Sequence, residues 1–287
     1  MSWMLQGAAQ RREPREWFAG PEHVELALAG DIAAVRFVDP RLLVCTAPRV
    51  MLRSAPAAEA EAVSELLLGE IFAIVDVKHG FALGRCGHDN YIGWAPFDAL
   101  ALPSETASTH RITVRRAPVF ADASIKAAVL AELPFGAQFA GQAAGTMVAL
   151  AGGGFVHRRH VEAAPATRFA AAALFMGAPY VWGGRTPDGA DCSGFVQATL
   201  AAEGIALRRD TDLQREQGAP VEFAARAAGD LVFFPGHVGL LLAGDMLCHA
   251  NAHWMAVVAE PLADVIARID QGLDDIAKSA IGVRRFP

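Results

Sequence analysis

Cysteine is scarce in this sequence, and the spacing of the cysteines does not indicate a disulfide framework or a zinc site. The 287 residues include four cysteines, and none of them forms a C-x-x-C pair. This scatter argues against a disulfide-stapled fold and against a compact zinc cage. We therefore expect free thiols in a reducing compartment and no cofactor. The four are Cys45, Cys86, Cys192 and Cys248.

Basic residues are too few for a nucleic-acid partner. Lysine and arginine number 25 against 31 aspartates and glutamates, which gives a net charge of −6. A protein that binds the phosphate backbone carries a basic stripe, whereas only isolated pairs such as Arg115-Arg116 occur here. We expect no nucleic-acid partner.

Long apolar runs are missing as well. No stretch approaches the roughly 18 apolar residues of a membrane-spanning helix. Near the N-terminus, Arg11, Arg12, Glu13 and Arg15 fall where a signal peptide would carry its apolar segment. These absences predict a cytoplasmic protein with no membrane partner. The oligomeric state is not indicated by any pattern in the sequence.

What the sequence does contain is a change of pattern along the chain. Residues 1–47 form a mixed N-terminal arm. Residues 48–104 and 105–164 each hold short apolar segments about ten residues apart, which is typical of small all-β domains. Residues 165–287 begin with helical periodicity and continue with strands, the order of an α+β domain.

The two all-β stretches share an outline. Each begins with a strand that is followed by arginine, alanine and proline, as in Leu52–Pro56 and Val114–Pro118. Each then places a Leu-x-x-Gly step before a longer strand. A degenerate repeat of about sixty residues predicts two small β barrels. They resemble bacterial SH3-like domains, which are usually binding or positioning modules.

The reactive residue types gather around Tyr180–Leu200. Gly183, Gly184 and Pro187 make the first half turn-forming, and the second half has the apolar spacing of a helix. Cys192 therefore falls at a helix start, where free N–H groups and the helix dipole favour a thiolate. The alternative is a small buried structural cysteine.

A cysteine nucleophile needs a base, and His237 and His249 are the best-placed histidines. His237 directly precedes a strand predicted at 238–243, and His249 lies in the strand predicted at 246–250. Because side chains alternate, the histidines share a face only if the connection has an odd number of residues. We predict the three-residue connection 243–245, which pairs Gly239 with His249.

Two other interpretations of these residues stay open. Each histidine could be a satisfied structural group beside apolar strand residues. Cys192, His237 and His249 could also bind zinc, since the residue types are suitable. The set lacks a compact ligand pair, however, and we expect no metal.

The same blocks resemble the signature of the NlpC-type bacterial cell-wall cysteine peptidases. The resemblance covers roughly residues 167–287 and implies a papain-like α+β fold. It also implies hydrolysis of the bond between γ-D-glutamate and a diamino acid in peptidoglycan stem peptides. The matching blocks are Tyr180-x-Trp182-Gly183-Gly184, Asp191–Val196, Gly229–Phe234, Gly236–Gly239 and Leu247–Ala250.

Carried over residue by residue, the resemblance implies that Cys192 is the nucleophile, His237 the base and His249 the orienting third residue. The Tyr180 hydroxyl would join the Cys192 backbone N–H in holding the oxyanion. Tyr180 could instead be a structural tyrosine beneath the glycine turn.

Family members with two barrels before the peptidase domain resemble recycling enzymes that require a free N-terminal L-alanine. The resemblance implies that the first barrel closes one end of the cleft and that Asp191 holds the substrate ammonium. The implied substrate-binding residues are Asp191, Ser193, Glu70, Tyr91, Asp210 and Thr211.

The sequence thus predicts a cytoplasmic γ-D-glutamyl-L-diamino acid endopeptidase. Its partner would be a peptide derived from peptidoglycan, with meso-diaminopimelate or lysine as the diamino acid, and L-Ala-γ-D-Glu would be released. Two alternatives stay open. One is an inactive protein whose barrels bind cell-wall fragments. The other is a thiol acyltransferase or amidase on the same fold, because nucleophile and base would be shared.

Overall fold

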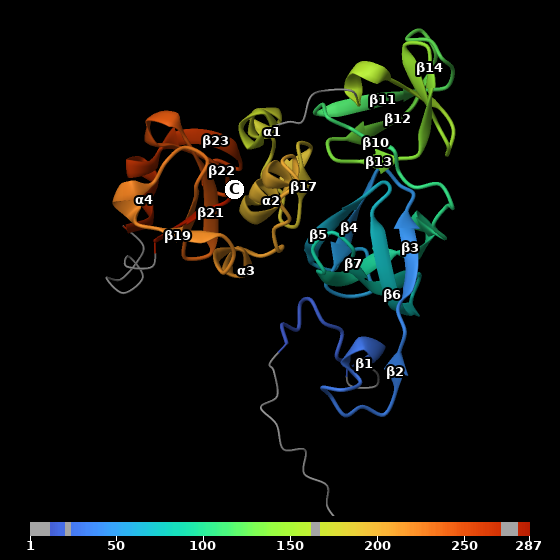
Figure 1. Ribbon diagram of the computed structural model, residues 1–287, viewed down its shortest axis with the longest axis horizontal. Coiled ribbons are helices and arrows are strands. Elements are labelled where there is room, and N and C mark those ends of the chain that lie inside the picture. The colour runs from blue at the N-terminus through green and yellow to red at the C-terminus, as the bar shows by residue number, and fades with distance from the viewer. Residues whose placement is uncertain (1–11, 21–23, 162–166, 271–280) are drawn as a thin grey trace, which may run out of the picture.

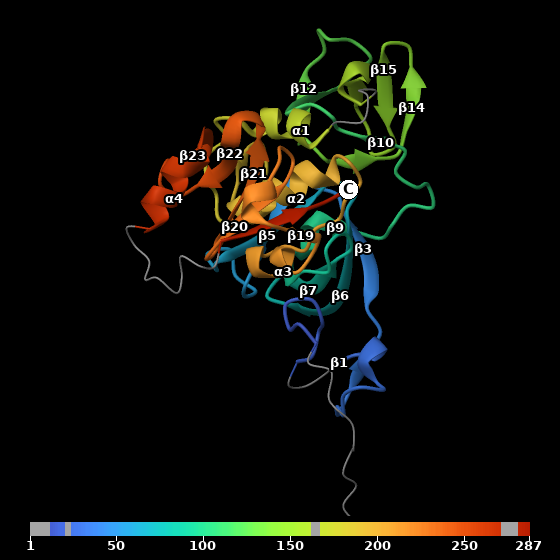
Figure 2. The same ribbon diagram turned by 60° about the vertical axis from the view of Figure 1, so that its left-hand side comes forward.

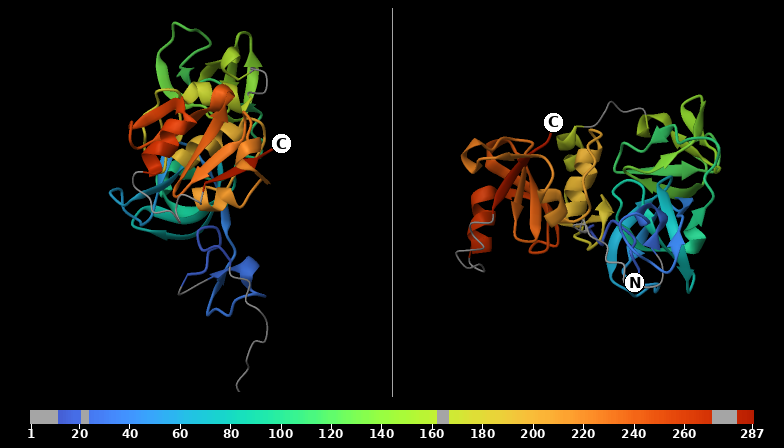
Figure 3. Two further views of the ribbon diagram at one scale, coloured as in Figure 1. Left: turned by 90° about the vertical axis from the view of Figure 1, so that its left-hand side faces the viewer. Right: turned by 60° about the horizontal axis from the view of Figure 1, so that its bottom comes forward.

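The computed structural model describes residues 12–20, 24–161, 167–270 and 281–287. Two β barrels lie next to each other, and an α+β domain lies beside them (Figure 1). Figure 2 and the right-hand view of Figure 3 keep this arrangement, with helix α4 on the side of the α+β domain that faces away from the barrels. The helices of the described residues are too short or too polar to cross a membrane.

The first barrel is a seven-stranded sheet in the order β5-β4-β8-β7-β6-β3-β9. Strand β3, which comes first in the chain, pairs with β6 and β9. The sheet therefore begins at Arg41, inside the stretch 1–47 that the sequence assigns to the arm. Alternate side chains of Phe81–Cys86 are buried, as expected for a strand with one face in a core. The elements are β3 (Arg41–Cys45), β4 (Arg49–Arg53), β5 (Ala62–Leu67), β6 (Ile71–Lys78), β7 (Phe81–Cys86), β8 (Ile92–Pro96), the 3-10 turn η2 (Phe97–Ala99) and β9 (Leu100–Ala101).

The second barrel has a five-stranded sheet in the order β12-β11-β16-β15-β14 and a separate β10–β13 pair. Its core is small and aliphatic, with Ile112, Val148 and Val156 buried. The elements are β10 (His110–Arg111), β11 (Arg116–Phe120), β12 (Val129–Pro134), β13 (Gln138–Phe139), β14 (Gly141–Ala144), β15 (Met147–Leu150), β16 (Phe155–His157) and the 3-10 turn η3 (Arg158–His160).

The N-terminal arm holds little regular structure. The strands β1 (Val24–Glu25) and β2 (Phe37–Val38) pair in parallel, with the 3-10 turn η1 (Leu26–Leu28) between them. Residues 1–11 of the predicted arm lie outside the described residues. So does the predicted boundary at 164–165.

The α+β domain has a six-stranded antiparallel sheet in the order β19-β24-β20-β21-β22-β23. The domain begins with α1 (Arg168–Phe175), the short strands β17 (Arg185–Thr186) and β18 (Gly189–Ala190), and α2 (Cys192–Ala201). The remaining elements are α3 (Thr211–Arg215), β19 (Ala219–Val221), η4 (Phe223–Ala225), β20 (Leu231–Phe234), β21 (His237–Leu242), η5 (Ala243–Asp245), β22 (Met246–Asn251), β23 (Ala256–Pro261), α4 (Leu262–Asp270) and β24 (Gly282–Arg285).

Helices cover both faces of this sheet. Helices α1 and α2 pack on one face, in a core that includes Phe175, Phe195 and Phe233. Helix α4 packs on the other face, where Val265 meets Phe234. Every residue of α2 from Cys192 to Leu200 is buried, because this helix lies between the sheet and the first barrel. The helix that starts at Cys192 is therefore fixed on all sides.

A buried polar interface joins the first barrel to the α+β domain. The Arg185 guanidinium forms an ion pair with Glu70, and its Nε donates to the Glu65 backbone carbonyl at 2.7 Å. Gln197 Nε2 on α2 donates to Asp89 Oδ2 at 2.9 Å. Buried charges that meet their partners across an interface fix its register, because no other placement satisfies them. The first barrel is thus held rigidly beside α2.

A cavity lies between the barrels. It has a volume of about 750 Å³ and is lined by apolar side chains such as Leu68, Leu130 and Phe139. None of the predicted site residues lines it.

Candidate active site

Cys192 is the first residue of α2, as predicted. Asp191 caps the helix, since its Oδ1 accepts from the Gly194 backbone N–H at 2.7 Å. The sulfur lies 3.8 Å from Thr211 Oγ1, and the Val238 backbone is close enough to the thiol to favour a lower pKa. Because Val238 follows His237 in β21, the sulfur lies next to the strand that carries the predicted base.

The predicted register of the two histidines is confirmed. The connection is the three-residue turn η5, and Leu240 pairs with Cys248. Continuing that ladder places Gly239 opposite His249, so His237 shares its face. Nε2 of His237 lies 2.7 Å from Nδ1 of His249. The two rings are therefore in direct contact at one edge of the hairpin.

Glu260 extends this contact, and the sequence did not reveal it. Its Oε1 lies 2.9 Å from Nε2 of His249. Glu260 is on β23 opposite Leu247, and Leu247 shares a face with His249 because side chains alternate. The register of the β22–β23 hairpin, had it been worked out, would have placed this carboxylate beside His249.

Burial sets the charge state of the reactive pair. Desolvation, helped by the neighbouring His249, lowers the pKa of His237 to about 3. Desolvation and the negative charge of Asp191 raise the pKa of Cys192. The resting pair is therefore a neutral thiol and a neutral imidazole. The effect of the helix start, which favours the thiolate, is outweighed by burial.

The carboxylate of Asp191 is fully occupied within the protein. Arg209 donates to both oxygens, from Nη1 at 3.0 Å and from Nη2 at 2.6 Å. The Gly183 backbone N–H donates to Oδ2 at 2.8 Å, in addition to the cap bond from Gly194. A carboxylate offers about four acceptor positions. These bonds hold Asp191 in place beside Cys192, and its contact with a substrate ammonium stays a prediction.

Two further residues that were predicted to bind substrate are used internally. Glu70 is 8% exposed and is paired with Arg185, and its Oε2 accepts from the Leu67 backbone N–H at 2.9 Å. The Ser193 hydroxyl accepts from Arg209 Nη1 at 2.7 Å. The predicted substrate contacts of these two side chains stay predictions. Their polar atoms already have buried partners.

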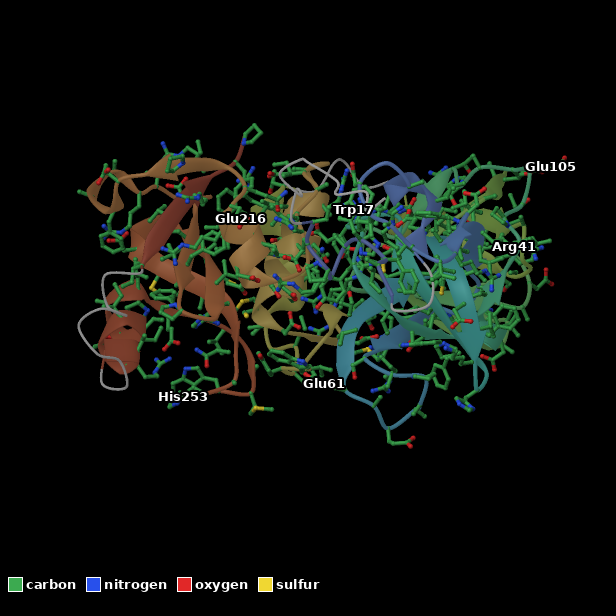
Figure 4. The ribbon with its side chains drawn as sticks, turned by 90° about the horizontal axis from the view of Figure 1, so that it is seen from below. Trp17, Arg41, Glu61, Glu105, Glu216 and His253 are labelled. Carbon is green, nitrogen blue, oxygen red and sulfur yellow. The ribbon has the colours of Figure 1, made fainter. Side chains whose placement is uncertain are left out.

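The other three predicted substrate-binding residues come together beside the sulfur. The Tyr91 hydroxyl of the first barrel donates to Asp210 Oδ2 at 3.0 Å, and Thr211 is next in sequence. Arg15 of the arm donates to the same Asp210 oxygen at 2.8 Å and to Asp212 at 2.7 Å. Figure 4 shows Trp17 of the arm at the boundary between the barrel and the α+β domain. Three chain segments thus form one wall.

Negative charge is in excess at this wall. The Arg15 guanidinium donates hydrogen bonds to the carboxylates of Glu13, Asp210 and Asp212. One guanidinium balances one of these three charges, so the group as a whole is anionic. Such a group attracts a cation.

Tyr180 is half-buried near the thiol. Burial, together with the nearby Cys192, raises the pKa of its phenol, so the hydroxyl keeps its proton and can donate. Within the described part of the chain the hydroxyl has no hydrogen-bond partner. Both properties suit a donor for an oxyanion, as predicted for this residue.

The zinc interpretation of the reactive residues does not fit their geometry. Both ring nitrogens of His249 are taken, one by His237 and one by Glu260. A second group, Cys86, His88 and Asp89, places its ligand atoms within 4.8 Å of one another. There, burial and the charge of Asp89 raise the pKa of Cys86 well above its ordinary value, so the thiol holds its proton.

Comparison with known proteins finds family matches in the first barrel and in the α+β domain. Residues 177–266 match the NlpC/P60 family. Residues 52–100 match the bacterial dipeptidyl-peptidase SH3 domain. The match includes Cys192, His237 and His249. The family that was predicted from the sequence is thus confirmed, and it supports a peptidase.

Curated relatives resemble a limited part of the chain. The gamma-D-glutamyl-L-lysine dipeptidyl-peptidase of Bacillus subtilis is 38% identical over 86 residues, which is 27% of this chain and 29% of that protein. The protein of the same name from Bacillus cereus is 39% identical over 97 residues, 31% of this chain and 29% of that protein. The alignments therefore span less than a third of these relatives.

A solved structure resembles nearly the whole chain. It is an NlpC/P60 family protein from Bacillus cereus, with a TM-score of 0.72 and 20% identity, and the match covers 86% of this chain and 99% of that one. At this identity the likeness shows the fold. The predicted fold class, a papain-like α+β domain preceded by SH3-like barrels, is confirmed.

Proposed function

Because the chain carries an NlpC/P60 domain and a bacterial dipeptidyl-peptidase SH3 domain, we propose that it is a cysteine peptidase that cuts the γ-D-glutamyl–diamino acid bond of peptidoglycan stem peptides. The observation that carries the proposal is the placement of Cys192. Its sulfur lies at a helix start beside β21, the strand that presents His237 to His249.

The reaction follows from these groups. His237 takes the thiol proton as the Cys192 sulfur attacks the γ-glutamyl carbonyl. The Cys192 backbone N–H and the Tyr180 hydroxyl hold the oxyanion. The carbon–nitrogen bond breaks, the leaving amine takes the proton from His237, and a thioester remains. Water, deprotonated by His237, then hydrolyses the thioester and restores the thiol.

The wall formed by Tyr91 and Asp210 selects the substrate. A stem peptide with a free N-terminal L-alanine carries an ammonium group, and this wall has an excess of carboxylates beside the sulfur. The ammonium group is held by Asp210 and by the oxygen of the Tyr91 hydroxyl. Because the Arg185–Glu70 ion pair and the hydrogen bond from Gln197 to Asp89 fix the barrel beside α2, the wall keeps a constant distance from Cys192. The products are L-Ala-γ-D-Glu and a diamino acid.

A site that accepts only short peptides with a free amine suits peptides already released from the cell wall. Their recycling takes place in the cytoplasm. The wall-bound peptide is blocked at its N-terminus by an amide and lacks the ammonium group. The proposed role is therefore recycling.

The test is incubation of the protein with L-Ala-γ-D-Glu-meso-diaminopimelate and with its L-lysine counterpart. Turnover by the wild type and by Cys45→Ala, together with none by Cys192→Ala, supports the proposal. Cys45 is a buried barrel thiol and controls for the general loss of a cysteine. Tight binding of the peptides without any turnover would instead indicate a binding protein.

A further inference from the structure

Three side chains follow one another from the reactive edge across strands β21, β22 and β23. His237 contacts His249, and His249 contacts Glu260, at 2.7 Å and 2.9 Å respectively. His249 is completely buried, so no water competes for its nitrogens. Each contact must therefore pair one donor with one acceptor.

The position of the proton on His249 is fixed by Glu260. Glu260 accepts hydrogen bonds from Arg268 and from the Trp254 indole N–H. Although partial burial works against it, these bonds and the one from His249 lower the pKa of Glu260 to about 2. The carboxylate is ionised and has no proton to give. The bond at 2.9 Å thus needs a proton on Nε2 of His249, which leaves Nδ1 as an acceptor.

Asn251 offers a competing arrangement. Its Oδ1 accepts from the His253 backbone N–H at 2.6 Å, which turns its amide nitrogen toward Nε2 of His249 at 3.4 Å. If that nitrogen donated, the proton of His249 would sit on Nδ1. The contact is half an ångström longer than the bond to Glu260 and is not assisted by a negative charge. The charged, shorter bond is the stronger one.

The tautomer of His249 determines the tautomer of His237. Because Nδ1 of His249 is an acceptor, Nε2 of His237 must carry the proton that bridges the 2.7 Å contact. Nδ1 of His237 then has a free lone pair, and it is the one ring nitrogen left to receive the proton of the thiol. The opposite tautomer of His249 would put the proton of His237 on Nδ1 and remove the base.

We propose that Glu260 is a positioning residue of the reaction, because its carboxylate selects the tautomer of His249 and, through it, that of His237. This inference rests on the proposed function for its kinetic consequence. Its structural content, the protonation of His249 on Nε2, does not depend on any substrate.

The first test is the variant Glu260→Met, which keeps the length of the side chain and removes the acceptor. Asn251 is then the remaining polar partner of Nε2 in His249 and selects the wrong tautomer. We expect kcat to fall about 10- to 100-fold, the range seen when a residue that orients a metal-bound histidine is removed, with KM within about twofold. The matched control is Glu132→Met, which also removes a carboxylate paired with an arginine but lies in the second barrel.

The second test is the long-range proton–nitrogen NMR spectrum of the histidine rings. The wild type is expected to show His249 protonated on Nε2, and Glu260→Met to show it on Nδ1. Glu260→Gln keeps one acceptor oxygen and should retain more activity than Glu260→Met. If Glu260→Met fails to fold, the wild-type spectrum alone decides the tautomer.

The outcomes separate the two proposals. A wild type without turnover but with His249 protonated on Nε2 contradicts the proposed function and leaves the tautomer assignment confirmed. A wild type with His249 protonated on Nδ1 overturns the assignment. An unchanged kcat in a folded Glu260→Met variant of an active wild type overturns the positioning role.

Discussion

Both terminal nitrogens of Arg209 donate to Asp191, the residue directly before the reactive cysteine. This ion pair is buried. Arg209 is 1% exposed and Asp191 is 5% exposed, and Arg209 also reaches Ser64 of the first barrel at 3.1 Å. One guanidinium thus fixes the cap of α2, the Asp191–Ser193 turn and the adjacent barrel. The position of Cys192 depends on this ion pair.

We therefore expect Arg209→Gln to be strongly destabilising. Removing one partner of a buried ion pair leaves the other charge unpaired, which costs about 3–5 kcal/mol. Urea unfolding measures the change in the free energy of unfolding. The control is Glu132→Gln, which removes the exposed partner of an exposed arginine and should cost about 1 kcal/mol or less. Equal effects at both positions would contradict the assigned role of Arg209.

The pH dependence of kcat/KM should show an acid limb well below pH 6.5, the ordinary imidazole pKa. His237 must be neutral to act as a base, and burial lowers its pKa, so the base stays competent as the pH falls below 6.5. An acid limb at pH 6.5 would contradict this.

The free energy of unfolding should depend on pH through the same lowered pKa of His237, and it serves as the control for the kinetic measurement. The unfolded chain takes up the His237 proton near pH 6.5, whereas the folded chain resists it. This contribution to stability is therefore complete above pH 6.5 and is lost as the pH falls toward the folded pKa. Thermal unfolding at each pH separates the two effects.

The two tyrosines of the chain should affect different kinetic constants. Tyr91→Phe removes a hydroxyl from the proposed ammonium site, so KM for the free tripeptide should rise about threefold to tenfold with little change in kcat. Tyr180→Phe removes an oxyanion donor, so kcat should fall about 10²-fold. Initial rates with the free tripeptide measure both, and the two variants act as controls for each other. The reverse pattern would exchange their roles.

Acetylation of the N-terminus of the tripeptide tests the anionic wall itself. The acetylated peptide has no ammonium group for Asp210, and we expect its turnover to be lost. Comparable rates for the two peptides would show that the wall does not select the free amine.

Local patterns sufficed for the parts of the site that depend on neighbours in the chain. Asp191-Cys192-Ser193 before an apolar period indicated the helix start, and Gly244-Asp245 with an odd connection set the register of the histidines. Both follow from backbone geometry over a few residues. The motifs around Cys192 carried the family resemblance, and with it the fold.

Long-range partners could not be read in the same way. The family resemblance places Asp191 beside the substrate, but no local pattern shows that Arg209 bonds to both of its oxygens. The resemblance also places Glu70 at the cleft, but no local pattern shows that Arg185 of the α+β domain pairs with it. Such pairings are decided by packing, and they determine which polar groups remain available to a ligand.

The central claim is tested most directly by the masses of the products formed from L-Ala-γ-D-Glu-meso-diaminopimelate. The account predicts L-Ala-γ-D-Glu and free diaminopimelate from the wild type and the intact tripeptide from Cys192→Ala. Intact tripeptide after incubation with the folded wild type, or release of alanine as the first product, would contradict it.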